Sequence, residues 1–114
     1  MANEKKYSWY KIAESEADLF GRGNNNLALV HLHGRELCLS RARQKIYACN
    51  DRCPHAGGKL HQGWVDALGN VVCPVHQYRF NPEKGNNTSG EGYFVKTYPV
   101  VTNDNGVFVG LETD

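Results

Sequence analysis

The sequence predicts an all-β protein, built as a sandwich or barrel of short antiparallel strands. Apolar and aromatic runs alternate with turn residues, often Gly and Asn, along the chain. No segment shows the 3.6-residue apolar period of an amphipathic helix, whereas short strands at this spacing are typical of all-β domains. Three such runs follow one another between residues 27 and 49, which indicates a meander of hairpins.

The N-terminal part of the chain is expected to contribute one strand. Residues 9–13 are mostly apolar and aromatic, and they form the first predicted strand. Residues 14–20 are expected to form no more than a turn. The polar, Gly/Asn-rich stretch 21–26 is predicted to be a loop.

The central meander is predicted to turn at residues 33–34 and 41–44. Its three strands are expected at residues 27–32, 36–40 and 45–49.

The C-terminal part is predicted to return to strands after a loop. Residues 86–92 are polar and Gly-rich and are predicted to form a mobile loop. Residues 93–98 and 100–101 are strand-like. Asn105-Gly106 is predicted to open a hairpin into a last strand at residues 107–111.

Length and charge narrow the range of functions. The 114 residues are expected to form one domain, 1–114, and the net charge of +1 comes without a long Lys/Arg run, so no nucleic-acid partner is predicted. The lysines near the N-terminus are followed by no apolar stretch, which predicts neither a signal peptide nor a membrane anchor. We therefore expect a cytoplasmic protein that does not bind membranes.

Two short motifs carry the chemistry. Cys53-Pro54-His55 and Cys73-Pro74-Val75-His76 each combine one thiolate and one imidazole, and 17 residues separate His55 from Cys73. Each proline restricts the backbone directly after its cysteine, so that the loop bends and presents the following histidine. Iron in a sulfide cluster is the transition-metal centre best known for this mixed sulfur and nitrogen set.

A structural zinc site is the alternative, because zinc also takes tetrahedral sulfur and nitrogen ligands. Zinc sites usually space paired ligands by two to four residues, and only one residue separates Cys53 from His55. Zinc also leaves the two Cys-Pro pairs unexplained. The pattern therefore favours an iron-sulfur centre over zinc.

The two motifs resemble the Cys-x-His and Cys-x-x-His signature of the Rieske [2Fe-2S] family, and the resemblance extends over residues 9–111. It implies a Rieske-type β fold with an inserted cluster-binding subdomain at about residues 50–80. It also implies one [2Fe-2S] cluster per chain, with Cys53 and Cys73 on one iron and His55 and His76 on the other.

The resemblance further implies a low reduction potential. High-potential members carry an extra cysteine in each loop, joined in a disulfide, and Ser and Tyr hydroxyls aimed at the cluster. The matching positions here are Gly58 and Val75 for the cysteines, and Tyr78 and Phe80 for the hydroxyls. Because a disulfide and one hydroxyl are missing, we expect a midpoint near the low end of the family range, roughly −150 mV rather than +300 mV.

Within the family, the chain is similar to free-standing ferredoxins of aromatic-ring dioxygenases and to the small subunit of assimilatory NAD(P)H nitrite reductase. The first similarity implies an electron carrier, not an enzyme, that accepts electrons from a flavoprotein reductase and passes them to an oxygenase or a similar acceptor. A nitrite reductase subunit and a redox sensor remain as alternatives. The sequence is compatible with a monomer.

Other residues that could bind a metal receive simpler interpretations. Cys38 and Cys49 are predicted to be small buried side chains, with a cross-strand disulfide as the alternative. His31 and His33 are expected to alternate on one strand as half-buried polar residues, and His61 is not predicted to be a ligand.

Two further groups are expected around the cluster. The backbone N–H groups at Gly57 and Gly58, and the residues Gln77 and Tyr78, are candidate donors to sulfur. Trp64 and Phe80 are predicted to pack as core aromatics.

Overall fold

The computed structural model describes residues 6–21, 26–54, 57–88 and 92–113. Almost all regular structure in these ranges is antiparallel β, which confirms the predicted all-β class. The elements are β1 Tyr7–Ala13, α1 Glu16–Phe20, β2 Leu27–Leu32, β3 Arg35–Ala42, β4 Lys45–Asn50, the 3₁₀ turn η1 Leu60–Gln62, β5 Trp64–Val65, β6 Val71–Val72, β7 Arg79–Phe80, β8 Thr97–Tyr98, β9 Val100–Asn103 and β10 Gly106–Glu112.

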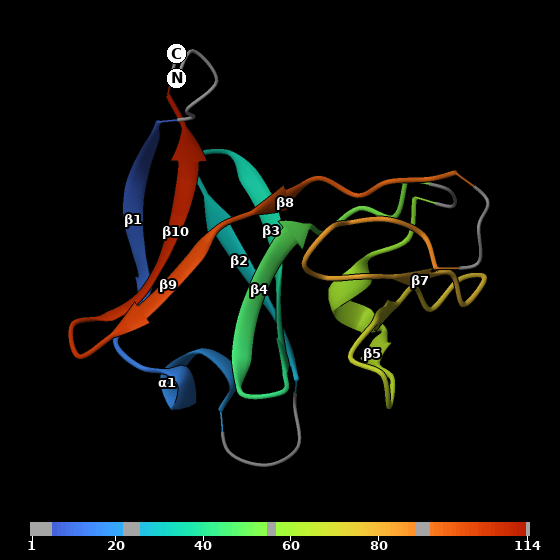
Figure 1. The fold of residues 1–114 in the computed structure, drawn as a ribbon, viewed down its shortest axis with the longest axis horizontal. Coiled ribbons are helices and arrows are strands. Elements are labelled where there is room, and N and C mark those ends of the chain that lie inside the picture. Colours follow the sequence, from blue (N-terminus) through green and yellow to red (C-terminus); the bar gives the residue numbers. More distant parts are fainter. Residues whose placement is uncertain (1–5, 22–25, 55–56, 89–91, 114) are drawn as a thin grey trace.

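The strands form three sheets (Figure 1). The first has the order β1-β10-β9, the second β2-β3-β4-β8, and the third β5-β6-β7. The chain crosses from the second sheet to the first through Pro99, between β8 and β9. The first two sheets share a core to which α1 also contributes, made of Phe20, Leu37, Leu39, Ala48, Tyr98, Val109 and Leu111.

The meander β2-β3-β4 forms as predicted. Its turns have positive φ at both central residues, 49° and 77° at His33-Gly34 and 53° and 67° at Arg43-Gln44. This is the backbone geometry of a tight hairpin turn that follows the twist of its strands. His33 therefore lies in the predicted turn and not on the strand with His31, so the expectation that these two histidines alternate on one strand was wrong. The His33 ring packs on Tyr10, with 4.3 Å between the ring centroids.

Two predictions outside the meander were wrong, one for residues 14–20 and one for the last hairpin turn. Residues 16–20 form the helix α1, whose N-cap Ser15 accepts a hydrogen bond from the Asp18 N–H at 3.1 Å. A helix of five residues is too short to produce a periodic apolar pattern. The β9–β10 turn lies at Asp104-Asn105, one residue before the predicted pair, and Gly106 already belongs to β10.

The strand predicted at residues 93–98 is also shorter than expected. Only Thr97–Tyr98 pairs with the second sheet. Residues 93–95 pair with the loop before them, because the Tyr93 carbonyl accepts from the Asn87 N–H at 3.0 Å and the Val95 N–H donates to the Gly85 carbonyl at 2.9 Å. Asn87, near the start of the predicted mobile loop 86–92, is thus held by hydrogen bonds, and residues 89–91 of that loop lie outside the described residues.

The third sheet and η1 lie on the side of the molecule opposite β1 and β10 (Figure 1). A second core joins this region to β3 and β4; it contains Cys38, Cys49, Cys53, Leu60, Val71, Cys73, Phe80 and Val95. No helix among the described residues has the length and hydropathy that crossing a membrane requires.

Candidate metal centre

The two Cys-Pro motifs form six-residue loops that are closed by the same pair of hydrogen bonds. In the first loop, the Cys53 N–H donates to the Gly58 carbonyl at 2.8 Å, and the Gly57 N–H donates to the Cys53 carbonyl at 2.9 Å. In the second loop, the Cys73 N–H donates to the Tyr78 carbonyl at 2.8 Å, and the Gln77 N–H donates to the Cys73 carbonyl at 2.9 Å. Two loops of different composition are therefore closed in the same way.

The fifth residue of each loop has left-handed backbone geometry. Gly57 has a φ of 71° and Gln77 a φ of 60°. Glycine adopts this conformation freely, whereas an L-residue such as Gln77 incurs a cost of about 1 kcal/mol. The second loop thus holds a strained residue that its hydrogen bonds must stabilise.

The two cysteine thiols lie together in the interior. Cys53 and Cys73 are both buried, and burial raises the pKa of the Cys73 thiol, as does its hydrogen bond with the Cys53 thiol. The backbone N–H groups of Val75 and His76 act in the opposite direction on this pKa, because they donate to the Cys73 sulfur. The two sulfurs are therefore close enough to share one metal cluster.

The N–H groups of two of the four expected donors to sulfur, Gly57 and Gln77, make other hydrogen bonds. The Gly57 and Gln77 N–H groups close their loops by donating to cysteine carbonyls, and the donors to the Cys73 sulfur come from Val75 and His76. Residue type does not reveal this choice, because every residue except proline carries an N–H group. Only the path of the loop decides which of them point at the sulfur.

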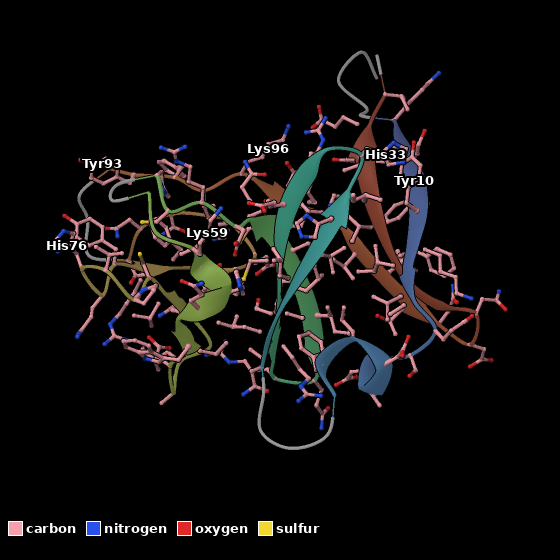
Figure 2. The ribbon with its side chains drawn as sticks, turned by 180° about the vertical axis from the view of Figure 1, so that it is seen from behind. Tyr10, His33, Lys59, His76, Tyr93 and Lys96 are labelled. Carbon is pink, nitrogen blue, oxygen red and sulfur yellow. The ribbon has the colours of Figure 1, made fainter. Side chains whose placement is uncertain are left out.

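Of the two predicted histidine ligands, His76 is among the described residues and His55 is not. His76 is exposed at the outer end of the second loop, and Figure 2 shows it near Tyr93, at the end of the molecule away from Tyr10 and His33. His55 lies outside the described residues. His76 is thus placed where an imidazole bound to a buried cluster would reach the surface.

Gly58 and Val75, which the resemblance matched to a disulfide, are adjacent. A Cβ on Gly58 would lie 2.5 Å from Val75 Cγ2, 3.5 Å from Val75 Cβ and 3.1 Å from Cys73 Sγ. The two loops therefore touch at this point, and only glycine fits beside Val75 and the sulfur. The four cysteines are free thiols in the structure.

The aromatic residues around the loops divide into a buried and an exposed group. Phe80 is buried as predicted, whereas Trp64 is 43% exposed, so the prediction that it packs in the core was wrong. Tyr93 packs on Tyr78 with 5.9 Å between ring centroids, and the next residue, Phe94, is 66% exposed. The rim near the second loop therefore presents apolar side chains to solvent.

Cys38 and Cys49 lie directly opposite each other on β3 and β4 and are buried. The hydrogen bond between the Cys38 and Cys49 thiols, together with burial, raises the pKa of Cys38 well above its usual value. They form a pair of free, buried side chains, as the simpler of the two sequence interpretations expected.

Comparison with known proteins identifies the family. The model of the Rieske [2Fe-2S] domain matches residues 8–99. The chain belongs to the Rieske [2Fe-2S] domain family. Rieske proteins carry a [2Fe-2S] cluster, and the donor set fits one, since two thiols converge and backbone N–H groups approach the Cys73 sulfur. The chain is an electron carrier rather than a catalyst.

Three relatives illustrate the similarity. The ferredoxin component of the naphthalene 1,2-dioxygenase system of Pseudomonas putida is 30% identical over 83 residues, which cover 72% of this chain and 79% of the relative. A solved complex of reduced oxygenase and oxidised ferredoxin in carbazole 1,9a-dioxygenase matches with a TM-score of 0.76 and 25% identity over 93% of this chain and 95% of that chain. A putative NADH-dependent nitrite reductase small subunit from Mycobacterium tuberculosis has a TM-score of 0.80 and 21% identity, covering 96% and 99% of the two chains.

Proposed function

We propose that this Rieske protein passes single electrons from a flavin or NAD(P)H reductase to an oxygenase, through a cluster held by Cys53, His55, Cys73 and His76. The observation that carries the proposal is the pair of identically bonded loops whose buried thiols are in contact. The similarity to the ferredoxin component of the naphthalene 1,2-dioxygenase system supports the choice of acceptor. A cytoplasmic location and a monomeric state are part of the proposal.

The residues around the site would have different roles in such an electron carrier. A bound cluster would supply a centre that gains and loses one electron. The Val75 and His76 N–H groups donate to the Cys73 sulfur, and such donors favour the more negative, reduced state. The two cysteine sulfurs are buried away from water, while the exposed His76 offers a short path for the electron to a partner protein.

The rim next to His76 is suited to transient docking. Val75 is 52% exposed and Phe94 66% exposed, and Tyr93, the residue before Phe94, packs on Tyr78 at the end of the second loop. Exposed apolar side chains grouped on a surface are typical of interaction sites. A partner that covered this rim would bring its own redox centre close to the imidazole of His76.

The ligand assignment is tested by replacing His76 with Ala in protein purified without oxygen. We expect loss of the red-brown colour and of the Rieske-type EPR signal, together with lower iron and sulfide content. His33→Ala is the matched control, because that exposed imidazole lies in the β2–β3 turn and packs only on Tyr10 among the contacts described here. An unchanged signal in the His76 variant would contradict the assignment, and a colourless wild type containing zinc would contradict the cluster.

A nitrite reductase small subunit is the second candidate, because the solved subunit and this chain share their fold over nearly their full lengths. The two candidates differ in their electron acceptor. Reduced protein should be reoxidised by a Rieske oxygenase under the first and by a sirohaem-containing reductase under the second. Stopped-flow absorption with each purified acceptor distinguishes them.

A further inference from the structure

A buried carboxylate lies at the base of the first cysteine loop. Asp51 is 1% exposed, and both of its carboxylate oxygens have partners on His61. Oδ1 accepts from the His61 backbone N–H at 2.7 Å, and Oδ2 lies 2.7 Å from the His61 Nδ1, which donates when the carboxylate is ionised. One side chain thus binds both the backbone and the ring of one residue.

These bonds close the stem from which the first loop emerges. The Leu60 N–H donates to the Asp51 carbonyl at 2.6 Å, Arg52 pairs with Lys59, and the Cys53 N–H donates to the Gly58 carbonyl. The two chain segments are therefore joined step by step from Asp51 up to the ligand Cys53. The Asp51–His61 pair is the innermost step of this series.

The first loop depends on the pair because its stem is weak. The second loop extends from the β6–β7 ladder, in which Val72 pairs with Arg79. In the described part of the first stem, the corresponding pairing is the isolated bridge between Arg52 and Lys59. A buried carboxylate without partners is costly, so the bonds to His61 strongly favour the closed stem.

We infer that Asp51 and His61 are positioning residues for the cluster, which hold Cys53 opposite Cys73 by closing the stem of the first loop. The inference rests on the proposed function only in that it requires a bound cluster. Neither residue needs to touch the cluster. The pair acts through the backbone, because Asp51 precedes Cys53 by two residues and His61 follows Gly58 by three.

The test compares three variants of the cluster-loaded protein. Asp51→Ala removes both acceptors, and His61→Ala keeps the backbone bond but removes the ring. Asp51→Asn is the conservative variant, because its amide oxygen accepts from the His61 N–H and its NH₂ group donates to Nδ1. Val109→Ala is the control for stability, since it opens a cavity in the other core without touching the loops.

The readouts are the EPR g-values of the reduced protein and the rate of cluster loss to a chelator. We expect both Ala variants to shift the g-values and to lose the cluster about tenfold faster, in line with the loss of a charge-assisted hydrogen bond. Asp51→Asn should retain the wild-type g-values. Val109→Ala should lower the unfolding temperature with unchanged g-values.

Two results would overturn the inference. One is that His61→Ala has wild-type g-values and loses its cluster no faster than Val109→Ala. The other is that Asp51→Asn behaves like Asp51→Ala, since the hydrogen bonds would then not be the cause. A wild-type protein without a Rieske signal would instead refute the proposed function, so the two failures are distinguishable.

Discussion

The contact between Gly58 and Val75 shows at the scale of single residues how the two loops are matched to each other. The Val75 side chain packs so closely on Gly58 that a Cβ on Gly58 would lie 2.5 Å from a Val75 methyl carbon. A valine in one loop therefore requires a glycine in the other. The absence of a side chain at position 58 also leaves room for the Cys73 sulfur, 3.1 Å from that same point.

Replacing both residues with cysteine should create a disulfide between the loops. The Cβ positions would be 3.5 Å apart, at the short end of the range that disulfides adopt. We expect the oxidised double variant to unfold at a higher temperature than its reduced form, with a gain of roughly 1 to 3 kcal/mol in the free energy of unfolding. Thermal unfolding with and without reductant measures this gain.

The matched control for the disulfide is Val75→Cys alone, which leaves glycine at position 58. Its unfolding temperature should not depend on the reductant. Two free thiols in the oxidised double variant, counted after denaturation in addition to the four native ones, would show that the bridge does not form.

At the scale of elements, Asp66 holds the β5–β6 hairpin to β7. Its Oδ1 accepts from the Leu68 and Asn70 N–H groups at 2.9 Å each, and its Oδ2 accepts from Arg79 Nη1 at 2.7 Å. Burial raises the pKa of Asp66, but the hydrogen bonds from Asn70, Arg79 and Leu68 outweigh it and lower this pKa overall. The carboxylate therefore fastens the strand that follows the second cysteine loop.

This depressed pKa predicts how the hairpin responds to acid. A group with a lowered folded-state pKa stabilises the protein above its unfolded pKa, here 3.8, and that contribution is lost as the pH falls through the folded value. Asp66→Asn should therefore be less stable than the wild type at pH 7, by about 1 kcal/mol. The difference should shrink as the pH falls below about 4.

Urea unfolding of both proteins at several pH values between 7 and 3 measures this difference. Asp104→Asn is the control, because Asp104 lies exposed in the β9–β10 turn. A stability difference for Asp66→Asn that stays constant down to pH 3 would contradict the electrostatic explanation.

At the scale of the whole molecule, the cysteine loops and the first sheet occupy opposite sides (Figure 1). The second core connects the loops to the second sheet, because Cys38 and Cys49 of the meander pack in the same cluster as Cys53 and Cys73. Electron exchange is therefore expected at one end, where His76 and Tyr93 lie (Figure 2).

Docking at this end predicts an effect of Phe94 on electron transfer between proteins. Phe94→Ser should slow the reduction of a purified Rieske oxygenase by about tenfold, as loss of an exposed aromatic contact commonly does. Leu68→Ser is the matched control, since Leu68 is equally exposed, at 69%, but lies in the β5–β6 turn.

Oxidation of the reduced Phe94 variant by hexacyanoferrate provides the second comparison, because this small ion needs no docking surface. Its rate should equal that of the wild type. Equal slowing by Phe94→Ser and Leu68→Ser in the oxygenase assay would place the docking surface elsewhere.

Much of the fold could be predicted because apolar runs and turn residues are local features of the sequence. The meander followed from alternating apolar runs and from the residues at positions 33–34 and 41–44, although the second turn is shorter than predicted because Arg41 and Ala42 belong to β3. The helix α1 and the pairing of residues 93–95 with their preceding loop were missed. The helix is too short to give a periodic pattern and depends on its N-cap. The pairing of residues 93–95 depends on tertiary contacts that override local propensity.

The sequence by itself predicted the donor set of the centre, two thiols and two imidazoles in loops that contain proline, because ligand chemistry follows from residue type and spacing. It also determined the family. Only the tertiary structure decided that the Val75 and His76 N–H groups face a sulfur, that Asp51 closes on His61, and that Trp64 faces solvent. These features depend on segments brought together by folding, and spacing along the chain does not specify such contacts.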